Sequence, residues 1–175
     1  GTTSLLDNLL FWLKGQMAGK NLDRSNVVIF QLVKGLEDEH KMLLGRKNIA
    51  FNNVLHPQMF VHADKEMIRI VLRNLISNAI KFTPENGSID IHAEQTATDS
   101  LIYVEDTGIG MSKETIDRVN AKQYYTTAGT SMEKGSGFGL MLCSDLINRH
   151  DGSLTIESVP GKGSRFIIKL PVTKA

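Results

Sequence analysis

The segment from Asp64 to Phe82 constrains the fold most, because its pattern predicts one long amphipathic helix. Asp64 is a residue type favoured at helix N-caps, and Thr83-Pro84 marks the end of the helix. Apolar residues recur at spacings of three and four, as a face that packs on a core requires. This apolar stripe consists of Ile68, Leu72, Leu75, Ala79 and Phe82.

A second face of this helix is polar. Asn74, Asn78 and Lys81 are spaced at i, i+4 and i+7, so they lie on one side. Asparagine is a mediocre helix former, and two asparagines one turn apart in mid-helix need a reason. They form either an ordinary solvated surface or a site in which an amide oxygen binds Mg²⁺ and an ammonium group contacts phosphate. The helix alone leaves both interpretations open.

The rest of the chain predicts a mixture of strands and helices. An extended piece at 26–28 leads into one helix that ends at 45–48 and has Leu43 on its core face. His62-Ala63-Asp64 indicates the start of the long helix. Further strands are expected at 49–53, 88–94, 101–105, 154–158 and 165–170, and further helices at 5–17, 113–119 and 139–149. Helices and strands do not alternate strictly, so we expect an α/β sandwich of the α+β kind.

Composition excludes several classes of protein. The 175 residues favour one domain with a short appendage. Lys plus Arg number 20 and Asp plus Glu number 19, and the net charge of +1 argues against nucleic-acid binding through bulk charge. The one cysteine, Cys143, excludes an internal disulfide and suits a reducing cytoplasm. No apolar run approaches the roughly 18 residues of a membrane span, so we expect no direct membrane contact. Because the sequence begins at Gly1, we expect a piece of a longer protein.

A carboxylate and two glycines follow the strand expected at 101–105. The ionised Asp106 can accept a hydrogen bond from an exocyclic amine, while Gly108 and Gly110 allow the backbone to approach a flat ligand closely. An ordinary Asp-Gly turn has the same pattern. This motif therefore predicts a ligand site only in combination with others.

Another glycine motif opens the helix expected at 139–149. It consists of Gly135, Ser136, Gly137, Phe138, Gly139 and Leu140. Glycines ahead of a helix N-terminus form an anion-binding cradle from free N–H groups and the helix dipole. The motif is not a Rossmann fingerprint, because its third glycine comes one residue early. The later sequence Gly161-Lys162-Gly163-Ser164 is not a P-loop, because Gly163 stands where Ser or Thr is required.

Taken in order, these motifs resemble the ATP-binding fold shared by sensor histidine kinases, gyrase, Hsp90 and MutL, and they are most similar to the sensor histidine kinases. Residues 74–84 look like the N box, 104–111 like the G1 box, 135–140 like the G2 box and 161–166 like the closing glycine motif. The resemblance implies a Bergerat-type α/β sandwich, with helices packed on one face of a mixed sheet.

The resemblance also divides the chain. Residues 21–175 are expected to form the catalytic ATP-binding domain. Residues 1–20 are expected to be the end of the second helix of a dimerisation and phosphotransfer hairpin, because their apolar stripe has nothing nearby to cover it. A helix docked on the core of this domain is the alternative interpretation.

Individual roles follow from the resemblance. Asn78 is expected to bind Mg²⁺, and Asn74 and Lys81 are the expected catalytic residues, which contact the metal or the phosphates. Asp106 is expected to accept a hydrogen bond from the adenine amino group and so to reject guanine. The other residues expected to bind ATP are Gly108, Gly110, Tyr125, Thr126, Lys134, Gly135, Ser136, Gly137, Phe138, Gly139, Leu140 and Ser164.

One position separates the activities of this superfamily. Its ATPases carry a glutamate general base one turn before the metal-binding asparagine, and here that position is Asn74, whose amide cannot accept the proton. We therefore expect a histidine kinase domain that transfers the γ-phosphate of Mg·ATP to a histidine on a separate domain. The expected partners are the hairpin that carries this histidine and the receiver domain of a response regulator, in the bacterial cytoplasm.

Two features depart from the family pattern. The aromatic box has Ala121 and Tyr124 where Phe is usual. None of the five histidines is interpreted as the phosphate acceptor, so the chain is not expected to phosphorylate itself. They are His40, His56, His62, His92 and His150, the last interpreted as a turn residue. Two alternatives stay open: an ATPase switch of the gyrase or Hsp90 kind, which Asn74 argues against, and a non-catalytic interaction module without nucleotide, which Ala121 favours.

Overall fold

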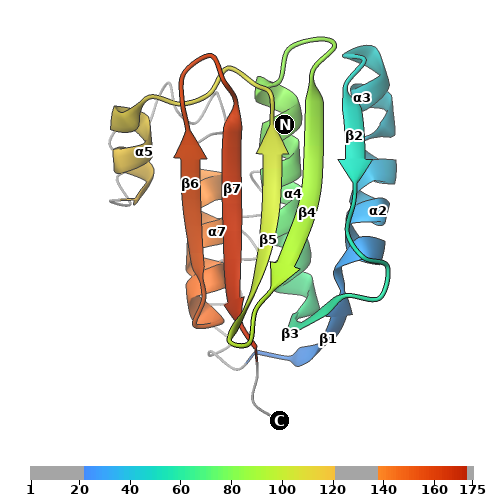
Figure 1. Cartoon of the computed structure of the whole chain (residues 1–175), viewed down its shortest axis with the longest axis vertical. Helices are drawn as coiled ribbons and strands as arrows, with labels where there is room; N and C mark the ends of the chain where they lie inside the picture. Colours follow the sequence, from blue (N-terminus) through green and yellow to red (C-terminus); the bar gives the residue numbers. More distant parts are fainter. Residues whose placement is uncertain (1–21, 121–137, 173–175) are drawn as a thin grey trace.

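A mixed β-sheet organises the part of the chain that the computed structural model describes, residues 22–120 and 138–172. Its five strands lie in the order β2-β4-β5-β7-β6 (Figure 1). They are β2 (Ala50–Asn53), β4 (Ser88–Gln95), β5 (Asp99–Asp106), β7 (Ser164–Pro171) and β6 (Ser153–Ser158). β2 pairs with β4 in parallel, and the other neighbours are antiparallel.

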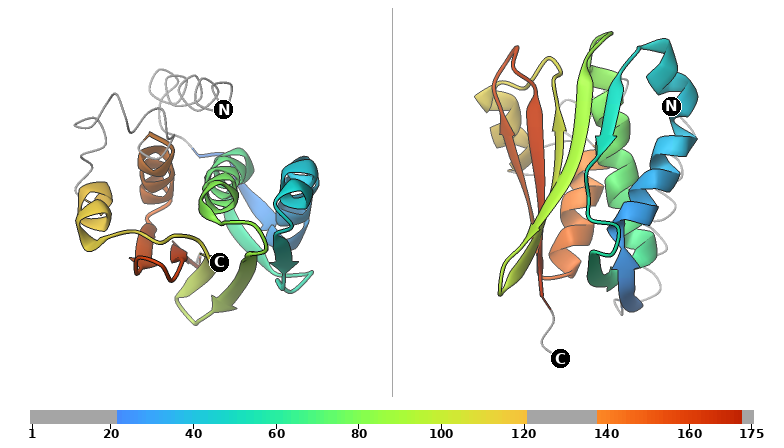
Figure 2. Two further views of the ribbon diagram at one scale, coloured as in Figure 1. Left: turned by 90° about the horizontal axis from the view of Figure 1, so that it is seen from above. Right: turned by 45° about the vertical axis from the view of Figure 1, so that its right-hand side comes forward.

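Helices cover one face of this sheet (Figure 2). They are α2 (Ile29–Glu39), α4 (Lys65–Phe82) and α7 (Phe138–Arg149). Alternate residues of the central strands are buried, as the two-residue period of a strand requires. These residues are Ile89, Ile91, Ile102, Val104, Phe166 and Ile168. The α/β sandwich expected from the sequence is confirmed.

Helix α4 lies at the centre of the helical layer, and the prediction of its extent is confirmed. The side chain of its N-cap, Asp64, accepts a hydrogen bond from the backbone N–H of Met67 at 3.1 Å. The buried side chains of α4 include Ile68, Leu72, Leu75, Ile76, Ala79 and Ile80. Burying each large apolar side chain contributes about 1.5–3 kcal/mol. The predicted stripe differs at its end, because Phe82 is only half-buried and lines a pocket.

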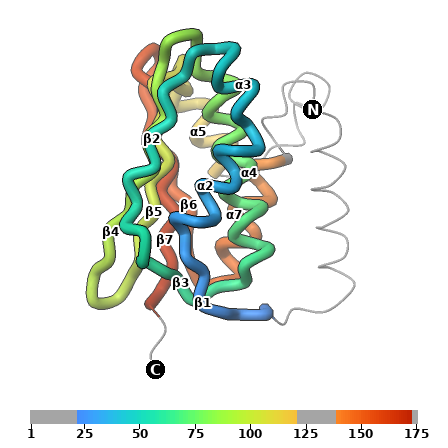
Figure 3. Tube along the Cα trace, turned by 90° about the vertical axis from the view of Figure 1, so that its right-hand side faces the viewer, coloured from blue at the N-terminus to red at the C-terminus, as the bar shows by residue number. Residues whose placement is uncertain are grey.

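A separate antiparallel pair, β1 (Arg24–Val28) and β3 (Phe60–Asp64), lies where the chain enters the described part (Figure 3). The extended piece expected at 26–28 belongs to β1. Sequence reasoning misses β3, because the strand ends on the residue that also caps α4. Val61 and Ala63 are buried and their neighbours are more exposed, which is the alternation of a strand.

The prediction of one helix up to 45–48 is wrong. The structure has two helices, α2 and α3 (Lys41–Arg46), and His40 lies between them with φ −104° and ψ 10°. This break changes which side chains face the core. Leu44 is 7% exposed and Leu43 is 42% exposed, so Leu44 and not Leu43 lies on the core face.

The predicted helix at 113–119 is confirmed as α5 (Lys113–Asn120), which lies beyond the β6 edge of the sheet (Figure 1). Residues 1–20 lie outside the described residues, so the predicted domain boundary stays a prediction. In the described ranges, no helix is both long and apolar enough to cross a bilayer.

His150 lies in the turn after α7, as expected, and it is also buried and joins two helices. Its Nδ1 lies 2.8 Å from the carbonyl oxygen of Leu146, and its Nε2 accepts the backbone N–H of Asp64 at 3.0 Å. An acceptor at Nε2 requires the proton to be on Nδ1, so the ring is neutral. His150 therefore ties the end of α7 to the start of α4.

We expect this contact to make the stability depend on pH. Burial lowers the pKa of His150 from its ordinary value of 6.5, Arg24 lowers it further, and the Leu146 carbonyl, Asp64 and Asp151 oppose the change. The unfolded chain therefore takes up the proton first, and the free energy of unfolding falls as the pH drops below 6.5 toward the lowered value. Above 6.5 this contribution is complete and constant.

The measurement is urea denaturation of the wild type and His150→Gln between pH 5 and pH 8. At pH 8 the variant should be less stable by about 1–3 kcal/mol, since two buried hydrogen bonds are disturbed. The difference between the two proteins should shrink as the pH falls. A difference that is the same at every pH would contradict the prediction.

Candidate functional site

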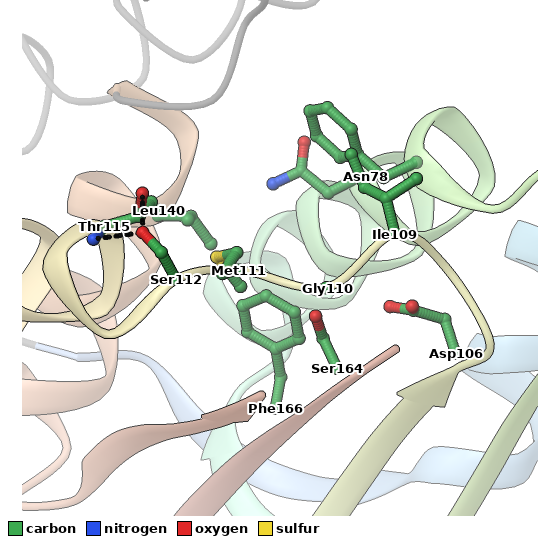
Figure 4. A pocket seen from close by; sticks show the side chains of 11 residues that line it. Asn78, Asp106, Ile109, Gly110, Met111, Ser112, Thr115, Leu140, Ser164 and Phe166 are labelled. Atoms are coloured by element: carbon green, nitrogen blue, oxygen red, sulfur yellow. Dashed lines mark hydrogen bonds between the residues drawn. The ribbon is translucent and has the colours of Figure 1, made fainter. Parts of the chain in front are cut away.

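A pocket of about 230 Å³ lies beside the end of β5 and the start of β7, against α4, α5 and α7 (Figure 4). Five residues singled out from the sequence line it. They are Asn78, Asp106, Gly110, Leu140 and Ser164. The structure thus brings together residues that are up to 86 positions apart in the chain.

Six further lining residues were not singled out as ligand contacts. They are Phe82, Ile109, Met111, Ser112, Thr115 and Phe166. Four of these are large apolar side chains, which suits a flat apolar ring. Three of the four, Ile109, Met111 and Phe166, lie inside the glycine motifs. Their place in these motifs could have indicated that they line the pocket. Ser112 accepts the N–H of Thr115 at 3.1 Å at the start of α5, and no sequence pattern indicated that it lines the pocket.

Asp106 places a carboxylate in this mostly apolar pocket. It is the last residue of β5, and its side chain points into the pocket (Figure 4). Its Oδ1 accepts the backbone N–H of Gly108 at 2.8 Å. Burial raises the pKa of Asp106, and the N–H groups of Gly108 and Ser164 act in the opposite direction. The carboxylate has further acceptor capacity, so it can pair with a hydrogen-bond donor on a ligand.

Because Gly108 and Gly110 have no side chain, other segments of the protein's own backbone can approach them closely. A Cβ on Gly108 would lie 2.7 Å from the carbonyl oxygen of Phe82. A Cβ on Gly110, where φ is +74°, would collide with the carbonyl oxygen of Val159. The two glycines therefore let the loop after β5 pack between α4 and the β6–β7 hairpin, and Gly110 alone of the pair lines the pocket.

The polar face of α4 is divided between two cavities. Asn78 lines the pocket that contains Asp106. Asn74, one turn earlier, donates from Nδ2 to the carbonyl oxygen of Ile70 at 2.8 Å and lines a neighbouring cavity of about 190 Å³. Lys81 does not line the first of these cavities, and its Nζ lies 5.5 Å from the ring centre of Phe82, which does.

The first turn of α7 reaches the pocket through Leu140. A Cβ on Gly139 would lie 3.0 Å from Oδ1 of Asn74, so α7 approaches α4 closely there. Phe138 begins the helix. Tyr125, Thr126, Lys134, Gly135, Ser136 and Gly137 lie outside the described residues and stay predictions.

Comparison with known proteins identifies the family. Residues 63–174 match the sequence model of the histidine kinase-, DNA gyrase B-, and HSP90-like ATPases. The chain belongs to this family. The family assignment and the resemblance to sensor histidine kinases expected from the motifs are both confirmed.

Two relatives in this family illustrate the similarity. The adaptive-response sensory kinase SasA of Crocosphaera subtropica is 33% identical over 170 residues, which is 96% of this chain and 44% of that protein. Sporulation kinase C of Bacillus subtilis is 38% identical over 112 residues, which is 64% of this chain and 25% of that protein. The chain therefore spans less than half the length of these curated relatives.

Solved structures of this family share the fold. The nucleotide-free catalytic domain of the histidine kinase ThkA superposes with a TM-score of 0.75 at 27% identity, covering 87% of this chain and 100% of that one. ThkA in complex with the response regulator protein TrrA superposes with a TM-score of 0.74 at 25% identity, covering 98% of this chain and 48% of that one.

Proposed function

We propose that this chain is the catalytic, ATP-binding part of a two-component sensor histidine kinase. The observation that carries the proposal is the carboxylate of Asp106 in a pocket whose walls are largely apolar. An adenine ring would lie between Phe82, Met111 and Phe166, and its amino group would donate to Asp106. Guanine would present a carbonyl oxygen to the same carboxylate and leave both acceptors unpaired.

The phosphates would extend from the base toward α4 and α7. The positive end of the α7 dipole and the ammonium group of Lys81 would attract them. Asn78 offers an amide oxygen, a ligand that suits Mg²⁺ when phosphates supply the rest of the coordination shell. When bound, Mg²⁺ would neutralise charge on the phosphates. No group of three or more His, Cys, Asp and Glu side chains that could hold a metal occurs in the described ranges, in agreement with an ion held mostly by the nucleotide.

The γ-phosphate would leave for a nucleophile outside this chain. Asn74 occupies the position where the family's ATPases have a glutamate base, and an amide cannot take a proton from water. All five histidines are described, and none lines the pocket. The acceptor histidine would lie on the dimerisation and phosphotransfer hairpin, of which residues 1–20 would be the end. A response regulator would then receive the phosphate, in the cytoplasm.

Calorimetric titration with Mg·ATP and Mg·GTP tests the proposal. We expect ATP to bind and GTP to bind about 100-fold or more weakly, because one buried hydrogen bond is replaced by two opposed acceptors. Equal binding of both nucleotides would contradict the role of Asp106. Steady release of phosphate from bound ATP, well above the rate without protein, would favour the ATPase alternative.

A further inference from the structure

The last turn of α4 is held by groups from outside the helix. The final carbonyl groups of a helix have no partner within it and need one elsewhere when they are buried. The carbonyl oxygen of Phe82 accepts the N–H of Ile109 at 3.1 Å. The carbonyl oxygens of Ile80 and Lys81 accept from Nζ of Lys47, at 2.6 Å and 3.3 Å.

Lys47 comes from a distant part of the chain, the loop between α3 and β2. Its own carbonyl oxygen accepts the N–H of Asn86 at 2.9 Å. The next residue, Asn48, donates from Nδ2 to Oδ1 of Asn86 at 2.7 Å. This short segment therefore binds both the end of α4 and the loop that follows it.

We propose that Lys47 is a positioning residue for the phosphate end of the nucleotide site, an inference that rests on the proposed function. It lines no part of the pocket, so it acts through α4. The turn that it caps carries Phe82, which lines the pocket, and Lys81, whose Nζ lies 5.5 Å from the ring centre of Phe82. The same turn is tied through the Phe82 carbonyl to Ile109, which also lines the pocket.

The charge of Lys47 matters as well as its hydrogen bonds. The C-terminus of a helix carries a partial negative charge of about half an electron. In the proposed complex the last turn of α4 carries Lys81, which would contact the phosphates, so this partial negative charge would repel them. The ammonium group of Lys47 offsets it. Loss of Lys47 should therefore weaken binding of ATP more than binding of adenosine.

The test compares four proteins at a temperature at which circular dichroism shows all of them folded. Lys47→Met removes the charge and donors but keeps the stem, and Lys47→Arg keeps charge and donors. Asp64→Ala is the matched control, because it removes the N-cap at the opposite end of the same helix and costs about 1 kcal/mol of stability. Affinities for Mg·ATP and for adenosine are measured by calorimetry.

We expect Lys47→Met to bind Mg·ATP about tenfold more weakly, because the partial negative charge at the end of α4 is then not offset. We expect adenosine binding to change by a smaller factor, and Lys47→Arg and Asp64→Ala to stay within about threefold of the wild type. Equal weakening by Lys47→Met and Asp64→Ala would overturn the proposal, since it would indicate a general loss of stability. Unchanged ATP binding in Lys47→Met would also overturn it.

Amide hydrogen exchange of the nucleotide-free protein separates this inference from the proposed function. Lys47→Met should speed exchange at Ile109 and Thr83, whose N–H groups bond to the end of α4, and Asp64→Ala should not. If the wild type fails to bind ATP, the proposed function is wrong, and the exchange data still decide whether Lys47 holds the pocket wall. If Lys47→Met does not fold, the same comparison is made with Lys47→Gln, and unchanged exchange there overturns the proposal.

Discussion

Asp106→Asn should weaken the binding of Mg·ATP by about 10- to 100-fold, the value of one hydrogen bond to a charged group. One carboxylate oxygen is already used by the N–H of Gly108. An asparagine has one side-chain oxygen in place of two, so either the N–H of Gly108 or the adenine amino group loses the oxygen that faces it. The other position would hold an NH₂ group facing a second donor. The measurement is calorimetric titration of the folded variant.

Asp99→Asn is the control for this change. Asp99 begins the same strand at its other end, where its carboxylate accepts the hydroxyl of Thr98 at 2.7 Å. The Asp99→Asn substitution removes the same charge from β5, at a residue that does not line the pocket. ATP affinity close to that of the wild type in Asp99→Asn, with a large loss in Asp106→Asn, would support an adenine site. Equal affinities in all three proteins would show that Asp106 does not contact the ligand.

Gly163→Ala should destabilise the fold by about 3 kcal/mol and also weaken ATP binding. Gly163 has φ +85°, and a Cβ there would collide with the carbonyl oxygen of Asp106. The clash is with backbone, so no side-chain rotation relieves it. The carbonyl of Gly163 also accepts from Oγ of Ser158 at 2.8 Å, and Ser158 in turn accepts the N–H of Met111. Displacing Gly163 therefore moves both the carboxylate and one wall of the pocket.

Gly161→Ala separates the collision from backbone strain. Gly161 has a similar φ of +79°, but nothing lies within 4 Å of a Cβ placed there. This variant should be destabilised only by the cost of a left-handed conformation, about 1–2 kcal/mol, and should bind ATP normally. Urea denaturation gives the free energies of unfolding, and calorimetry gives the affinities. Similar losses of stability in the two variants would contradict the steric argument.

Elements with strong local periodicity could be predicted from the sequence. Helix α4 combines an N-cap, an apolar stripe and a Pro stop, and its bounds agree with the structure. Strands β4 and β5 bury alternate residues, Ile89 and Ile91 in β4 and Ser100, Ile102 and Val104 in β5, and both strands agree with the prediction to within a few residues. Strand β3 has five residues and runs directly into α4, so the helix signal hides it.

Features made by contacts between distant residues could not be predicted. His150 contacts Asp64 across 86 positions, and Lys47 contacts Ile80 across 33. Local patterns describe His150 correctly as the residue after a helix, and they say nothing of its burial. In the site, too, residues within sequence motifs could be predicted, and residues brought in by packing could not. Its motifs indicated Asp106 and Asn78, while Ser112 and Thr115 line the pocket only because α5 packs beside β6.

The direction of α4 has a mechanical consequence. The chain enters the described part at β1, at the end of the molecule opposite the pocket (Figure 1). The N–H of Asp23 is bound there to the carboxylate of Asp64, 3.1 Å away. Tension applied to the chain before residue 22 is therefore borne first by the β1–β3 pair and the start of α4. The 18 residues of this helix, about 27 Å long, form a stiff rod between that attachment and the far end, where the pocket lies.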